Sequence, residues 1–248
     1  MNLIRAELLK LRKRRGLVAA AALVTIAPMA IGYTVLSILH AADPETYDPA
    51  GGIDNFTDSI ELLTQIGVVA AILIGATAGA GDHGAGVFRD LVVTGRSRLA
   101  LFAARVPGGL GLLVPLVGVA FAIAAVASVA TTGDGQSPVT DVTIAQTAGW
   151  VALTMVTAYA LALGVSSAFG SRGTAIGILL GWQLAAAPIL LTSGKLDGIL
   201  PNAALLALEP AEEAQLVTTS VPTAIAILVV WTLVPLAAGA WRTQRADA

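Results

Sequence analysis

Residues 62–81 read LLTQIGVVAAILIGATAGAG, and residues 82–105, directly after them, read DHGAGVFRDLVVTGRSRLALFAAR. The first stretch has no charged residue and, as a helix, is long enough to cross a hydrocarbon core of ~30 Å, which takes about 20 apolar residues. The second stretch is too polar to cross a membrane and too apolar for an ordinary linker. Together they predict a membrane span followed by a structured loop.

Five further apolar stretches are at least as long and lack charged residues in their interior. The sequence therefore predicts an all-α polytopic membrane protein whose single transmembrane domain takes residues 1–248. A signal peptide is the alternative for the first span, but that span is longer than the apolar region of about 7–15 residues in signal peptides. The six predicted spans lie near residues 17–39, 62–81, 106–130, 144–169, 174–194 and 221–241.

The basic residues divide unequally between the predicted loops. With the loops assigned to alternate sides, thirteen of the fourteen Lys and Arg residues fall on the side of both termini, and Lys195 alone falls opposite. Cytoplasmic loops retain positive charge, so both termini are expected in the cytoplasm of a plasma-membrane protein. The net charge of -2 averages two unlike faces, and no nucleic-acid partner is expected.

Several kinds of chemistry have no candidate residues. The chain has no cysteine, and its two histidines, His40 and His83, fall on opposite membrane faces, so neither a metal site nor a catalytic residue is predicted. The phosphate-binding pattern G-x-x-x-x-G-K-[ST] is missing, because Leu196 follows Gly194-Lys195 and Ile189 takes the upstream glycine position. No cofactor is expected in this chain. No span interior holds an ionisable residue of the kind that ion-driven transporters usually bury.

Small residues recur at helical spacing in two of the spans. Such stripes let helix backbones approach closely in lipid, and they indicate either packing within the chain or a subunit interface or translocation seam. The second span has Gly67, Ala71, Gly75 and Gly79 on one face, and the fifth has Gly173, Gly177 and Gly181.

The N-terminal residues 1–16 predict an amphipathic helix. Ile4, Leu8 and Leu11 recur at helical spacing, and basic side chains cover much of the rest. Such a helix lies in the membrane interface with its cations near anionic lipid. The alternative is a charge cluster that only sets the orientation of the chain.

The 82–105 loop predicts a short helix with an exposed apolar patch. Val87, Phe88, Leu91 and Val92 form the patch, glycines flank it, and Ser97 is placed to cap the next helix. The patch needs a cover, which is either lipid or a protein groove that accepts an amphipathic helix.

These features resemble the permease subunit of the type-2 ABC exporter family, over almost the whole chain. In that family the loop after the second span has an acidic residue, Gly-Thr, an apolar-basic stretch, Pro-x-Ser-Arg and a further basic residue. This chain departs from the pattern with Val87 in place of Thr and Gly95 in place of Pro. The matching positions are Asp82, Gly86-Val87, Phe88-Arg89-Asp90-Leu91, Gly95-Arg96-Ser97-Arg98 and Arg105.

The resemblance implies roles for this loop. Residues 87–93 would form a coupling helix that docks on a separate ABC ATPase subunit, which binds ATP and Mg. The expected contacts to that partner are Val87, Phe88, Arg89, Asp90, Leu91 and Val92. The expected supports of the loop are Asp82, Gly86, Ser97, Arg98 and Arg105.

Residues 195–220 predict two short helices separated by Glu209-Pro210. Pro201 suits a helix start, and Glu212 and Glu213 lie in the first turn of the second helix, where the helix dipole favours acid. The resemblance implies a re-entrant pair between spans five and six that caps the exit. The alternative is an amphipathic hairpin at the surface.

The expected function is the permease subunit of an ATP-driven exporter of apolar or amphipathic cargo, working as a homodimer or heterodimer in the lipid bilayer. The alternatives are a non-transporting scaffold or sensor that binds a cytoplasmic partner through the 82–105 loop and, third, a membrane-embedded enzyme. Aromatic side chains within the spans are candidates for the translocation path, with plain packing or interface anchoring as the alternative. They are Trp150, Tyr159, Phe169, Trp182 and Trp231.

Overall fold

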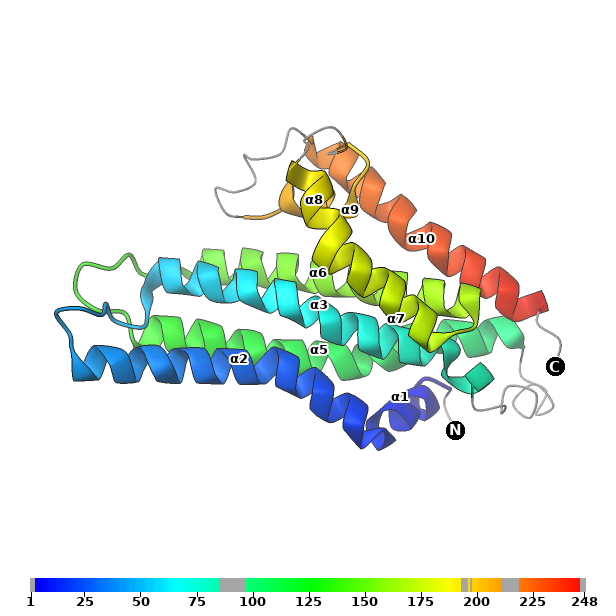
Figure 1. Cartoon of the computed structure of the whole chain (residues 1–248), viewed down its shortest axis with the longest axis horizontal. Helices are drawn as coiled ribbons and strands as arrows, with labels where there is room; N and C mark the ends of the chain where they lie inside the picture. The colour runs from blue at the N-terminus through cyan, green and yellow to red at the C-terminus, as the bar shows by residue number, and fades with distance from the viewer. Residues whose placement is uncertain (1–2, 85–96, 193–195, 197, 211–218, 246–248) are drawn as a thin grey trace.

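The computed structural model describes residues 3–84, 97–192, 196, 198–210 and 219–245, and every regular element among them is a helix (Figure 1). Six helical segments are long and apolar enough to cross a membrane, which confirms the predicted number of spans and indicates a multi-pass membrane protein. Two shorter helices, α1 (Leu3–Lys13) and α9 (Pro201–Leu206), complete the described fold. The spanning segments are α2 (Arg15–Ala42), α3 (Gly52–Gly84), α5 (Arg98–Ala130), α6 (Asp141–Phe169), the interrupted helix α7 (Arg172–Gly181) to α8 (Ala187–Thr192), and α10 (Val221–Arg245).

Side-chain caps fix several helix starts. The Ser97 hydroxyl accepts a hydrogen bond from the Ala100 amide at 3.2 Å, which confirms the predicted cap of α5. Thr140 and Ser171 cap α6 and α7 in the same way. These hydroxyls satisfy amide groups that have no partner within the helix.

Two helices begin well before the predicted spans. The helix α3 begins at Gly52, ten residues before the predicted span, and α5 begins at Arg98 rather than near residue 106. The early turns of α3 carry polar residues such as Asp54 and Asp58, which a hydropathy pattern assigns to a loop although a helix continues through them. The backbone of α3 is helical up to Gly84, so both described ends of the predicted 82–105 loop are helical.

The helix α3 lies at the centre of the bundle and packs against α2, α5, α6 and α7. Its glycine stripe faces α6. A Cβ atom at Gly75 would lie 2.6 Å from the Tyr159 carbonyl oxygen, and one at Gly79 would lie 2.6 Å from the Leu163 carbonyl oxygen. The absence of side chains therefore permits the α3–α6 contact, and this stripe packs within the chain.

The second stripe has a different environment. Gly173, Gly177 and Gly181 on α7 are exposed, and a Cβ atom at any of them would meet nothing within 4 Å. Figure 1 shows α7 running obliquely across the bundle, with α8, α9 and the start of α10 standing apart from α2, α3, α5 and α6.

The fifth spanning segment is interrupted by a π-helical turn (Trp182–Ala186). There the Ala187 amide donates to the carbonyl of Trp182, five residues earlier, instead of four. A π-turn carries an extra residue and often occurs at functional sites.

The helix α1 packs against α5 at the end of the bundle where α10 also ends (Figure 1). Gly108 allows this contact, since a Cβ atom there would lie 2.5 Å from the Glu7 Cβ atom. Glu7 and Leu11 are buried, and Glu7 forms an ion pair with Lys10 at 2.6 Å. The predicted N-terminal helix is thus present; its place in the membrane interface stays a prediction.

Candidate functional site

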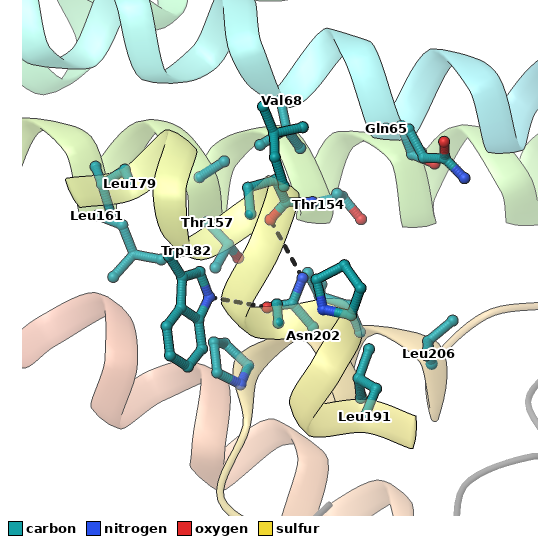
Figure 2. A pocket seen from close by; sticks show the side chains of 18 of the residues that line it. Gln65, Val68, Thr154, Thr157, Leu161, Leu179, Trp182, Leu191, Asn202 and Leu206 are labelled. Carbon is teal, nitrogen blue, oxygen red and sulfur yellow. Dashed lines mark hydrogen bonds between the residues drawn. The ribbon is translucent and has the colours of Figure 1, made fainter. Parts of the chain in front are cut away.

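A cavity of about 510 Å³ lies between α3, α6, the α7–α8 segment and α9 (Figure 2). Its volume lies within the range of about 300–1,000 Å³ that is typical of small-molecule sites. The wall combines apolar and polar groups. The apolar ones include Val68, Ile72, Leu161, Leu179, Pro188 and Leu191, and the polar ones include Glu61, Gln65, Thr154, Thr157, Gln183, Asn202 and Glu209.

Two hydrogen bonds through the Asn202 amide join α9 to the fifth spanning segment. The Trp182 Nε1 donates to Asn202 Oδ1 at 3.1 Å, and Asn202 Nδ2 donates to Gln183 Oε1 at 3.2 Å (Figure 2). These polar side chains find their partners across two elements. Asn202 therefore fixes one wall of the cavity, a role that its position after Pro201 did not signal.

Two other indoles bind the backbone of α9 and the residues just before it. The Trp150 Nε1 donates to the Leu205 carbonyl at 2.8 Å, and the Trp231 Nε1 donates to the Ile199 carbonyl at 2.8 Å. The rings of Trp182 and Trp231 lie 5.7 Å apart. Three of the predicted path residues thus anchor residues 199–205. Trp150 and Trp182 also line the cavity.

The remaining path candidates lie elsewhere. Tyr159 is fully buried and donates to the Arg105 carbonyl at 2.6 Å, away from the cavity lining. Phe169 ends α6 and is 54% exposed.

Tyr159 belongs to a buried polar cluster, the Arg105 cluster, formed by Gly79, Arg105, Tyr159 and Ser167. The Arg105 Nη1 donates to the Gly79 carbonyl at 2.9 Å, and the Ser167 hydroxyl donates to the same carbonyl at 3.2 Å. Arg105 has no exposed surface. The cluster ties α3, α5 and α6 together near the ends of the 82–105 loop.

The other predicted loop residues have separate places. Ser97 caps α5, and the Arg98 Nη1 donates to the Gln244 carbonyl at the end of α10, 2.9 Å away. Asp82 lies in the last turn of α3. Outside the described residues lie Gly86, Val87, Phe88, Arg89, Asp90, Leu91 and Val92.

Thr154 is the unusual polar group of the cavity. It is 6% exposed, and its hydroxyl has no hydrogen-bond partner although it lines the cavity (Figure 2). Thr25, Thr77 and Thr243, which are also buried, each donate to the carbonyl four residues earlier. A buried hydroxyl without a partner costs about 1–3 kcal/mol. No sequence pattern singled out Thr154, because only the helix arrangement aims it at the cavity.

The charged groups of the cavity lining are carboxylates. Among the described lining residues, Glu61 and Glu209 are charged and none is basic. The Glu61 Oε1 accepts a hydrogen bond from Gln65 Nε2, one turn later on α3, at 2.7 Å. The lining therefore has an acidic part at Glu61 on α3 and an apolar part around Leu161 and Leu179.

The fold and the cavity define a multi-pass helical membrane protein with a drug-sized cavity beside a short helix. No group of three His, Asp or Glu side chains within the described ranges is placed to hold a metal ion. Comparison of the sequence with protein-family models and with curated proteins found no match.

Proposed function

We propose that this chain is the permease subunit of a type-2 ABC exporter, which moves apolar or amphipathic cargo and is driven by a separate ATPase subunit. The observation that carries the proposal is the continuity of α3 and α6. Both helices contribute to the Arg105 cluster at one end and to the cavity wall further along. A force applied at the 82–105 loop would reach the cavity through two rigid helices.

The mechanism follows from this connection. Closure of the ATPase subunits on ATP would displace the coupling helix at residues 87–93 and, with it, the ends of α3 and α5. Because Arg105 joins α5 to α3, the two helices would move together. The cavity wall on α3 and α6 would then shift relative to the fifth spanning segment, which lines the cavity from another side. In this proposal α9 belongs to a re-entrant segment that caps the exit, and two permease chains, identical or different, form the complex.

The orientation proposed is cytoplasmic for both termini, in the plasma membrane. The chain has no cysteine, so single cysteines report the side of each loop without background. Leu99→Cys should react only with reagents that cross the membrane, whereas Asp134→Cys should also react with impermeant reagents added outside. The reverse result would contradict the proposal.

The coupling role is tested by ATP turnover. The full chain, expressed with its candidate ATPase partner, should co-purify with that ATPase. Phe88→Asp and Leu91→Asp should reduce both co-purification and turnover, because a carboxylate would enter an apolar contact. Val142→Asp is the control, since Val142 is also apolar and is 65% exposed at the start of α6.

The outcomes separate the candidate functions. Unchanged turnover in Phe88→Asp would refute the coupling-helix assignment. A cytoplasmic partner that binds this loop without hydrolysing ATP would favour the scaffold or sensor function instead.

A further inference from the structure

We infer that the cavity between α3, α6, α7–α8 and α9 binds an amphipathic organic cation. The ligand is a drug-sized molecule with an ammonium group at one end, an apolar or aromatic body, and a hydrogen-bonding group between them. That this ligand is also the cargo rests on the proposed function; its binding does not.

The apolar body is required by the wall of the cavity. Leu161, Leu179 and Val68 contribute apolar surface, and the side chains labelled in Figure 2 come from α3, α6, the fifth spanning segment and α9 around one space. A cavity of about 510 Å³ is large enough for a drug-sized molecule. Apolar surface that leaves water on binding supplies most of the affinity in such sites.

The positive charge is required by the carboxylates and indoles. Glu61 lines the cavity from α3, one turn before Gln65. An ammonium group near this carboxylate gains Coulomb energy, whereas an anion would be repelled. Trp150 and Trp182 also line the cavity, and the faces of indole rings attract cations.

The hydrogen-bonding group is required by Thr154. Its hydroxyl is buried and has no partner in the protein, although it lines the cavity. The unpaired hydroxyl therefore destabilises the folded protein, and a hydrogen bond from a polar group on the ligand would offset that cost. Thr154 lies on α6, which packs directly against α3, the helix that carries Glu61.

The probe is dansylcadaverine, which has an aromatic body, a sulfonamide and a primary ammonium group. Its N-acetyl derivative keeps the body and the sulfonamide and loses the charge. Binding to the full chain, in nanodiscs of uncharged phosphatidylcholine, is measured as dansyl emission excited through tryptophan. We expect saturable binding of the amine, about fivefold tighter than binding of the acetylated form. Equal affinities, or signal that only partitions without saturation, would overturn the inference.

Glu61→Gln tests the carboxylate. We expect it to remove the preference for the charged probe while leaving the affinity for the acetylated probe unchanged, which also shows that the variant is folded. Asp58→Asn removes the same charge one turn earlier on α3, at an exposed position outside the cavity lining, and should keep the preference. If both variants lost the preference equally, it would come from the overall negative charge of this surface, and the proposed contact with Glu61 would be refuted.

Thr154→Val tests the hydroxyl at constant shape. We expect about a threefold loss of affinity for both probes, because both carry the sulfonamide. Thr147→Val, two turns earlier on α6 and also buried but outside the lining, should change neither affinity. Unchanged binding in Thr154→Val would refute the role of Thr154. Because no ATPase is present, failure of coupling leaves these results unaffected.

Discussion

The glycine stripes of α3 and α7 share a sequence pattern and differ in their surroundings. On α3, Gly75 and Gly79 lie against the backbone of α6, with no space for a side chain. On α7, Gly173 and Gly177 meet nothing within 4 Å. Small residues permit a close helix approach but do not supply the neighbour. The α3–α6 contact, here called the seam, is tightly packed, whereas the glycine face of α7 is open.

The difference extends to the polar groups. The seam ends in the Arg105 cluster, where a guanidinium, a tyrosine and a serine bond to carbonyls across helices. Around the cavity, indole and amide groups hold the short helix α9, and the hydroxyl of Thr154 has no partner. We therefore expect substitutions in the seam to change global stability and substitutions near α9 to act locally.

The largest expected effect is that of Gly75→Val. The added side chain would collide with the Tyr159 carbonyl and separate α3 from α6, so we expect a loss of about 3 kcal/mol in the free energy of unfolding. The measurement is unfolding of the purified chain in mixed micelles by increasing SDS. Gly177→Val is the control and should change stability by less than about 0.5 kcal/mol. Equal losses would remove the distinction between the two stripes.

Arg105→Met should follow in magnitude. It removes the charged donor to the Gly79 carbonyl, and bonds of that kind contribute about 1.5–3 kcal/mol. We expect a loss of about 2 kcal/mol in the same titration. Arg172→Met removes an exposed basic residue at the start of α7 and should have little effect. If Arg105→Met left the free energy of unfolding unchanged, the Arg105 cluster would not stabilise the α3–α6 contact.

Tyr159→Phe removes a single neutral hydrogen bond from the cluster. The ring stays and only the bond to the Arg105 carbonyl is lost, so we expect a loss of about 1 kcal/mol. Tyr47→Phe, at a residue that is 43% exposed, is the control with the same atom removed. If the two variants were equally stable, the buried bond would contribute nothing.

Trp182→Phe should have the smallest global effect and a clear local one. Loss of the bond to Asn202 should accelerate amide hydrogen exchange of residues 201–206 by about fivefold, with little change elsewhere. Trp241→Phe, at a residue that is 56% exposed near Arg245, should leave this exchange unchanged. Faster exchange throughout α3 and α6 would show that α9 is part of the same cooperative unit as the seam.

The span count could be predicted from sequence because hydrocarbon thickness limits the length of apolar runs. The Ser97 cap could be predicted because capping is local. The environments of Gly75 and Gly177 could not, since both depend on which helices are neighbours. The start of α3 at Gly52 was missed because helices continue into polar turns where hydropathy changes.

The cavity is the least local feature, and the sequence pattern did not predict it. Trp150 and Trp182 were candidates as aromatic residues inside spans, and they do line it. Tyr159 and Trp231 had the same pattern, yet one belongs to the Arg105 cluster and the other lies outside the lining. Thr154 and Asn202 carried no signal, because a threonine and an asparagine become notable only through what they face.

The π-helical turn at Trp182–Ala186 has a consequence for every residue after it. One surplus residue rotates the following helix by about 100° relative to an uninterrupted one. This phase slip directs Ala187 and Leu191 toward the cavity and leaves Ile189 on the outside, where it is 68% exposed. Deleting one residue from the turn would restore the regular winding and rotate α8 by about 100°, which would turn Ala187 and Leu191 away from their present places in the cavity lining.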